Sequence, residues 1–222
     1  DFNDFFHSVI LETFKKAGLE GDYKVKYETL VASDYGVPQN RKRVIIFGTR
    51  CDMKIEPNYP KFNITNKTTL KDAIYDLPRE YDILIPNHKG NSHKVKINGY
   101  VGNRELIWDK PSPTITGRGS RSGGAVIHPH PDKHRRLTVR ECARIQSFPD
   151  DFYFIGSNGA CYSQIGNAVP PIMSFFIANE FRELFDMKKV IFEKFQWKLP
   201  YSYKIDEKSF DDTLETMDKK YA

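Results

Sequence analysis

The chain has 222 residues, of which 39% are hydrophobic and 14% aromatic, and its formal net charge is +5. This composition excludes a disordered chain, and the lack of any apolar run of about 18 residues excludes a transmembrane helix. Three widely spaced cysteines indicate a reducing compartment, which we take to be the cytoplasm, and no disulfide framework: Cys51, Cys142 and Cys161.

The first 50 residues predict a helix followed by two strands. Apolar side chains recur at helical spacing over residues 2–17, and Gly18 is suited to end that helix. Residues 23–31 alternate between apolar and charged side chains, which predicts a half-buried strand, whereas the apolar run 43–49 predicts a buried one. Because two strands alone are marginally stable in water, we interpret this region as the edge of a larger α/β sheet.

Capping boxes predict two short helices further along the chain. Thr69 with Asp72 starts the first, inside a weakly periodic segment that is rich in Pro, Asn, Lys and Thr. Thr138 with Glu141 starts the second, over residues 138–147. Two arginines of this second helix are four residues apart and therefore share a face, which we predict to be directed at one partner: Arg140 and Arg144.

A turn and two prolines introduce the last predicted helix. Residues 166–171 read Gly-Asn-Ala-Val-Pro-Pro, and prolines suit the first turn of a helix, whose apolar stripe then continues to about residue 187. The N-terminus of such a helix can receive an anionic group, although the turn can equally serve only to reverse the chain.

Positive charge is concentrated in two stretches. Residues 37–50 contain four basic and no acidic residues, and residues 117–146 contain seven basic and two acidic residues. The second stretch includes a glycine-rich basic loop at 117–124. This distribution indicates either a polyanion partner or a solvated basic face, and charge alone does not separate the two.

A short arginine motif, Gln39-x-Arg41-x-Arg43, lies in the first basic stretch. If the motif enters the strand, both arginines lie on one face, where guanidinium groups can hold a phosphate, a carboxylate or a base carbonyl. The alternative is an edge strand with surface arginines. Taken alone, so short a pattern favours the alternative.

Three histidines lie close together in the second basic stretch: His128, His130 and His134. Only the spacing of His130 and His134 fits a zinc-ligand pair, and no pair of cysteines accompanies them. The sequence therefore predicts no metal site, and we expect these histidines on a loop that faces DNA or solvent.

Together and in this order, the motifs resemble the C-terminal half of DNA (cytosine-5) methyltransferases. Residues 35–43 look like motif VIII of that family, residues 135–149 like motif IX and residues 165–171 like motif X. The Pro-Ser-Pro-Thr-Ile-Thr stretch at 111–116 resembles the end of the target recognition domain. The resemblance covers about residues 5–50 and 108–185, and the order of three motifs makes it specific.

The resemblance implies an α/β fold, with the edge portion of a Rossmann-like methyltransferase domain that depends on S-adenosylmethionine (SAM) and a small recognition domain. Residues 1–50 would form a helix and hairpin at the edge of the catalytic domain, and residues 51–136 the target recognition domain. Residues 137–187 would return to the catalytic domain, and residues 188–222 would be a C-terminal extension.

The resemblance also implies roles for individual residues. Arg41 and Arg43 would be catalytic, near a cytosine flipped out of duplex DNA. Three residues of motif X would approach the cofactor SAM: Asn167, Ala168 and Val169. Six residues would contact DNA: Gln39, Thr114, Arg118, Arg121, Arg136 and Arg140.

Several features of the family are absent from this sequence. Its nucleophile is a Cys that follows a Pro, and none of the three cysteines does so. The Glu-Asn-Val and Phe-x-Gly-x-Gly motifs do not occur either. We therefore expect the isolated chain to be inactive and its N-terminal half to be the missing partner. Because the chain begins with Asp1 and not Met, we expect a piece of a longer methyltransferase of the restriction-modification type.

Three alternatives stay open. The chain can be a separate DNA-recognition subunit of a split methyltransferase, with the nucleophile on a partner chain. It can belong to an RNA cytosine methyltransferase relative. A generic basic DNA-binding protein would explain the charge but not the order of the motifs.

Overall fold

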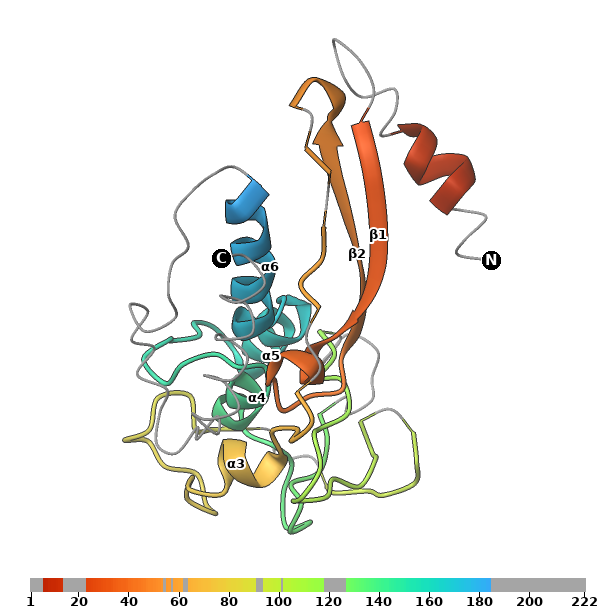
Figure 1. The fold of residues 1–222 in the computed structure, drawn as a ribbon. Coiled ribbons are helices and arrows are strands. Elements are labelled where there is room, and N and C mark those ends of the chain that lie inside the picture. Colours follow the sequence, from red (N-terminus) through yellow and green to blue (C-terminus); the bar gives the residue numbers. More distant parts are fainter. Residues whose placement is uncertain are drawn as a thin grey trace. The chain divides into compact units, whose positions relative to one another are not determined.

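A computed structural model describes residues 6–13, 23–53, 55–56, 58–61, 64–90, 94–100, 102–117 and 127–184 (Figure 1). The chain divides into two compact units. The strand unit contains Asp1–Leu30, Lys42–Lys61 and Phe175–Ile191, and the helical unit contains Val31–Arg41, Phe62–Ser174 and Phe192–Ala222. No helix in the described ranges is long and apolar enough to cross a membrane.

The strand unit is built on a two-stranded sheet, in which β1 (Tyr23–Val31) pairs with β2 (Lys42–Arg50). Both predicted strands are thus confirmed. The helix predicted over residues 2–17 is described only at 6–13, where the π-helix η1 covers Phe6–Leu11, and the rest lies outside the described residues. A 3-10 turn, η3 (Cys51–Met53), follows β2.

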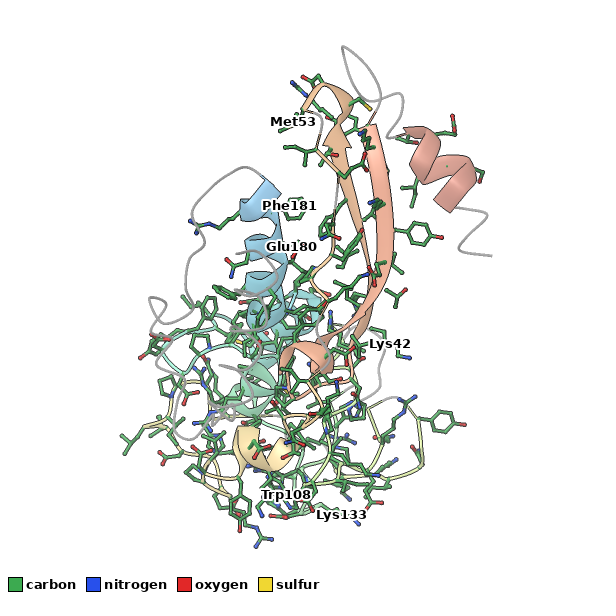
Figure 2. The ribbon with its side chains drawn as sticks, viewed as in Figure 1. Lys42, Met53, Trp108, Lys133, Glu180 and Phe181 are labelled. Atoms are coloured by element: carbon green, nitrogen blue, oxygen red, sulfur yellow. The ribbon has the colours of Figure 1, made fainter. Side chains whose placement is uncertain are left out.

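An aromatic cluster holds the strand unit together. The Tyr59 hydroxyl lies 2.7 Å from the Lys26 carbonyl oxygen on β1 and 2.9 Å from the Ile45 carbonyl oxygen on β2. Its ring stacks on Phe47 with centroids 4.5 Å apart, and Phe181 of α6 packs edge-on against Phe47 at 4.3 Å (Figure 2). Burial raises the pKa of Tyr59 to about 12, so this hydroxyl stays protonated and available as a donor.

Strand β2 is less buried than its apolar sequence predicts. Its first three residues are exposed, and only Phe47 and Thr49 are fully buried. The prediction of a buried strand was therefore wrong. The aromatic cluster covers only part of β2, and no third strand among the described residues covers the remainder.

The described part of the helical unit contains the 3-10 helix η2 (Ala32–Tyr35), three short α-helices and the start of a fourth. These are α3 (Leu70–Ile74), α4 (Val139–Ile145), α5 (Asn158–Asn167) and the first turn of α6 (Pro171–Leu184). Both predicted capping boxes are present, Thr69 with Asp72 and Thr138 with Glu141. The sequence did not predict α5, because its two glycines and its polar residues obscure the apolar positions that it buries.

One hydrophobic core runs through the helical unit and joins α3, α4 and α5 to irregular segments between them. Its members come from widely separated parts of the sequence: Leu70, Ala73, Ile74, Leu77, Leu106, Ile115, Ile127, Leu137, Val139, Cys142, Ala143, Ile145, Phe154, Cys161, Tyr162 and Ile165. Much of the helical unit is therefore irregular chain that is held by a shared core instead of by a sheet.

Helix α4 lies in the interior, and every one of its residues is buried. The expectation that Arg140 and Arg144 face an external partner was therefore wrong. Arg140 donates from Nε to the Pro86 carbonyl oxygen (2.8 Å) and from its terminal nitrogens to the carbonyl oxygens of Pro149 and Phe152 (both 2.9 Å). The arginine thus binds three carbonyl oxygens that belong to loops and not to a helix or a strand.

Arg144 joins the same helix to two carboxylates. It binds Asp150 through two parallel hydrogen bonds of 3.0 and 2.7 Å, and its Nη1 lies 2.5 Å from Asp76 Oδ1. Such bidentate pairs combine charge with fixed geometry. Thus α4 organises the loops on both sides of it through its arginines.

Two further arginines are buried just before α4. Arg135 forms a bidentate pair with Glu141, at 2.8 and 2.7 Å, so the capping-box acid also neutralises a cation. Arg136 is 2% exposed. It donates to the carbonyl oxygens of Gly102, Ile127 and Lys94 and to the side chain of Asn103.

The histidines also differ from expectation. His128 and His130 are 1% and 5% exposed, so neither lies on a loop that faces DNA or solvent. Burial lowers the pKa of both imidazoles to about 4, which keeps them neutral at pH 7. Only His134 of the three is partly exposed.

Candidate functional site

The motif segments of the sequence meet in the helical unit at the side chain of Gln39, which is fully buried. Its Nε2 donates to Gln146 Oε1 at 2.6 Å and to the Ile145 carbonyl oxygen at 3.3 Å, at the end of α4. Its Oε1 accepts a 2.9 Å hydrogen bond from the Ile115 backbone N–H. One amide therefore joins the loop before β2, the end of α4 and the segment 112–117.

Gln146 extends this connection to the end of α5. It is also fully buried, and its Nε2 donates to the Ile165 carbonyl oxygen at 3.0 Å and to the Ala168 carbonyl oxygen at 2.7 Å. The two glutamines in series thus connect the turn after α5 with the loop that carries Gln39. Sequence reasoning placed Gln146 in motif IX but assigned no role to it.

Arg41 closes the arrangement from the other side. It is 3% exposed, and its two terminal nitrogens donate to the carbonyl oxygens of Ile115 and Gly166, both at 2.8 Å. Ile115 is therefore held at both backbone groups, its N–H by Gln39 and its carbonyl by Arg41. We call these three side chains, Gln39, Arg41 and Gln146, the Gln39 network.

Two glycines allow the close backbone approach that the network stabilises. A Cβ atom on Gly166 would lie 2.3 Å from the Gly117 nitrogen, and a Cβ on Gly117 would lie 2.0 Å from Asn167 Oδ1. A side chain on Gly166 would require the backbone of residues 116–117 to move, whereas one on Gly117 would have to displace the Asn167 side chain. Gly166 is thus required by its contact with the backbone of residues 116–117, not only by the turn itself.

The segment that ends in Gly117 also pairs with the loop before β2. Asn40 N–H donates to the Ser112 carbonyl oxygen at 2.8 Å, and Ser112 N–H donates to the Pro38 carbonyl oxygen at 2.9 Å. The Thr114 hydroxyl lies 3.4 Å from the Asn40 carbonyl oxygen. Backbone pairing and side-chain bonds therefore fix residues 112–117 against residues 38–41.

The remaining predicted site residues lie in different environments. Strand β2 begins at Lys42, so Arg41 precedes it and the condition under which Arg41 and Arg43 would share one strand face is not met. Arg43 is exposed and donates to the Lys42 carbonyl oxygen at 2.7 Å. Asn167 and Val169 are exposed and Ala168 is partly exposed.

Other predicted DNA contacts are internal or lie outside the described residues. Gln39, Arg136 and Arg140 are buried, and their polar atoms bind groups within the chain. Arg136 and Arg140 are buried where they bind carbonyl oxygens of irregular segments, and Gln39 where it binds Gln146 and the Ile115 N–H. The sequence pattern did not show these partners. Arg118 and Arg121 lie outside the described residues.

A family comparison accounts for this clustering of motifs. The sequence model of the C-5 cytosine-specific DNA methylase family matches residues 3–183. The chain belongs to this family. The match includes both strands, the Gln39 network and α6 up to residue 183.

Curated relatives of this DNA methylase chain are type II methyltransferases. M.MthTI of Methanothermobacter thermautotrophicus is 38% identical over 188 residues, which are 72% of this chain and 57% of the relative. M.NgoPII of Neisseria gonorrhoeae is 36% identical over 185 residues, 70% of this chain and 54% of the relative. The chain thus spans about half the length of the curated relatives it matches.

Solved methyltransferase structures support the fold. A putative DNA modification methyltransferase encoded within an E. coli prophage matches 83% of this methylase chain and 64% of its own, with a TM-score of 0.60 and 22% identity. The S. pombe Dnmt2 methyltransferase matches with a TM-score of 0.53 and 16% identity, over 83% of this chain and 65% of its own. The chain therefore has an α/β methyltransferase-like fold.

Substitution of Gln39 by Ala is expected to lower the free energy of unfolding by about 2–4 kcal/mol, because it leaves the buried Ile115 N–H and Gln146 amide without their partner. Urea denaturation monitored by circular dichroism measures the loss. A matched control is Gln164→Ala, which removes an exposed glutamine bound to one carbonyl and should change stability by less than about 0.5 kcal/mol. Equal effects of the two substitutions would contradict the role of Gln39.

Proposed function

We propose that this chain is the C-terminal part of a type II DNA (cytosine-5) methyltransferase. The complete enzyme would transfer the methyl group of SAM to C5 of a cytosine flipped out of duplex DNA. The observation that carries the proposal is the Gln39 network, because it brings together the segments that resemble motifs VIII, IX and X and the end of the recognition domain.

The proposal assigns residues 1–50 and 137–187 to the edge portion of the catalytic domain and residues 51–136 to target recognition. The shared core of the helical unit supports a positioning role for α4, because residues from the recognition segment pack with α4 and α5. The buried arginines before and within α4 add to this by fixing loops of the recognition segment. Helix α4 would therefore position the recognition domain without touching DNA.

Within this scheme the two motif VIII arginines separate into different roles. Arg41 is a positioning residue, since its terminal nitrogens hold the backbone of Ile115 and Gly166. Arg43 is exposed on β2 and is the arginine that we propose for contact with the flipped base. Thr114, Arg118 and Arg121 keep their proposed contacts with DNA, whereas Gln39, Arg136 and Arg140 support the structure.

The proposed SAM contacts are Asn167, the last residue of α5, and the two residues after it, Ala168 and Val169. Asn167 and Val169 are exposed, while Arg41 donates to the Gly166 carbonyl oxygen and Gln146 donates to the Ala168 carbonyl oxygen, so the backbone of this turn is held in place beside a ligand. SAM supplies the methyl group, and the partner half of the enzyme would provide most of its binding site. The contribution of this chain is to hold the turn in place.

The nucleophile would also come from the partner half. Attack on the cytosine ring requires a thiolate. Burial raises the pKa of Cys161 and raises that of Cys142 well above its ordinary value, so both thiols stay protonated. Cys51 is exposed but follows an arginine and not a proline. We therefore propose that the isolated chain is inactive.

Complementation tests this proposal. The chain is mixed with a polypeptide that carries the family's N-terminal motifs, and transfer of tritiated methyl groups from SAM to duplex DNA and to tRNA is measured in parallel. We expect methylation of DNA by the mixture and none by either polypeptide alone. A mixture in which the partner's nucleophilic cysteine is replaced by alanine is the control.

Each other outcome of the complementation assay contradicts a definite part of the proposal. Activity of the chain alone would show that it contains a nucleophile. Methylation of tRNA but not DNA would reverse the substrate class. No activity in any pairing, together with no binding of duplex DNA, would overturn the proposed function.

The Arg43→Ala substitution tests the proposed base contact. In the reconstituted enzyme we expect kcat/KM for methylation to fall by about 100-fold or more, as for loss of one group that stabilises a transition state, with little change in DNA affinity. The matched control is Arg50→Ala, on the same strand, where the arginine pairs with Asp52 at the surface. If Arg43 instead binds a phosphate, the substitution lowers DNA affinity. The slope of log affinity against log salt concentration then decreases in magnitude by about one.

A further inference from the structure

A tight turn before α4 brings three potential metal ligands together. His130 N–H donates to the Arg135 carbonyl oxygen and Lys133 N–H donates to the His130 carbonyl oxygen, both at 2.8 Å. This turn gathers His130, Asp132 and His134, each of which offers one ligand atom within 4.8 Å of the others. Trp108 packs against the turn from a distant part of the sequence (Figure 2).

The hydrogen bonds of His134 leave one ring nitrogen available for a metal. Its Nε2 lies 3.0 Å from the Arg79 carbonyl oxygen. Because a carbonyl oxygen can only accept a hydrogen bond, this contact requires the proton of the ring to be on Nε2. Nδ1 is then the atom with the lone pair, and it is buried without a hydrogen-bond partner among the described residues. A histidine that donates one N–H to a carbonyl and presents the other nitrogen is the usual arrangement of a metal ligand.

Asp132 is oriented in a similar way, and His130 lies between two carboxylates. The Trp108 indole N–H donates to Asp132 Oδ1 at 3.2 Å, and Asp132 Oδ2 lies 3.7 Å from His130 Nδ1. At the other nitrogen of the same imidazole ring, Nε2 lies 3.8 Å from the carboxylate of Glu141. His134 and Asp132 are therefore each oriented by a hydrogen bond to a second group, as the ligands of a metal usually are.

We propose that His130, Asp132 and His134 form a binding site for a divalent transition metal, with Zn²⁺ as the best match. Two imidazoles and a carboxylate with a fourth position for water are an established zinc ligand set, whereas Mg²⁺ and Ca²⁺ prefer oxygen ligands alone. The exposed Asp132 gives solvent access to the fourth position.

The site needs only local movement to close around the metal. Ligand atoms in a tetrahedral zinc site lie about 3.3 Å apart, given bonds of about 2.0–2.1 Å. The Asp132 Oδ2 to His130 Nδ1 distance of 3.7 Å is near that value. The weak 3.2 Å hydrogen bond from Asp132 N–H to His130 Nδ1 would be replaced by the metal. Since Asp132 is exposed and His134 partly exposed, both can adjust.

The consequence of binding would be structural. The turn leads directly into α4, and it carries Arg135 and Arg136, which fix Glu141 and the irregular segment around Asn103. A metal at the turn would fix the positions of these arginines relative to α4. The simpler alternative is a metal-free aromatic cluster, since His130 packs edge-on against Trp108 at 5.3 Å and against His134 at 4.8 Å.

Isothermal titration of the full chain with Zn²⁺, after removal of metal by a chelator, tests the proposal. We expect one equivalent to bind, and Asp132→Asn and His134→Gln each to weaken its affinity by at least about tenfold, because changes even to the supporting groups cost about 10–100-fold. The matched control is Asp109→Asn, an exposed aspartate next to Trp108, which should bind Zn²⁺ as the unmodified chain does.

Two further measurements keep the test decisive. Circular dichroism of each variant verifies folding, and the exposed Asp132 makes Asp132→Asn a mild change. Substitution with Co²⁺ should give the intense visible absorption of a tetrahedral site with nitrogen and oxygen ligands. Absence of binding, or binding that the folded Asp132→Asn and His134→Gln variants leave unchanged, would overturn the site and favour the metal-free cluster.

Discussion

The side-chain amide of Gln39 is the contact on which the candidate site depends. It lies in the interior and has hydrogen bonds at both ends, to the Ile115 N–H on one side and to Gln146 on the other. A buried amide is stable only when such partners are present, so the positions of three distant segments are coupled through it. Gln146 and Arg41 then carry the coupling to the turn that contains Gly166.

Buried arginines have a similar part in the rest of the helical unit. Long irregular segments contain many carbonyl groups that no helix or sheet satisfies, and one guanidinium group offers five donors in a fixed plane. Arg136 and Arg140 use theirs mainly on such carbonyls, while Arg135 and Arg144 pair with carboxylates. The basic charge of residues 117–146 is thus partly a feature of the fold, and only the remainder is available to a polyanion.

Local signals in the sequence predicted the local structure well. Both capping boxes and both strands are present, because caps and alternation depend on neighbours within a few residues. Burial was less predictable: Arg140 and Gln39 are internal because segments far along the chain cover them. The same limit applies to the site, since the order of the motifs indicated that they cooperate but not that Gln146 links them. Helix α5 was missed because Gly159 and Gly166 weaken its pattern.

The central claim is that Gln39 and Gln146 act as one unit, and a double-mutant cycle measures this directly. The free energy of unfolding is determined for the unmodified chain, for Gln39→Ala, for Gln146→Ala and for the double variant. If the network couples the segments, the effects are non-additive, with an interaction energy of about 0.5–3 kcal/mol. Effects that add to within about 0.3 kcal/mol would show that the two glutamines act independently and would contradict the account.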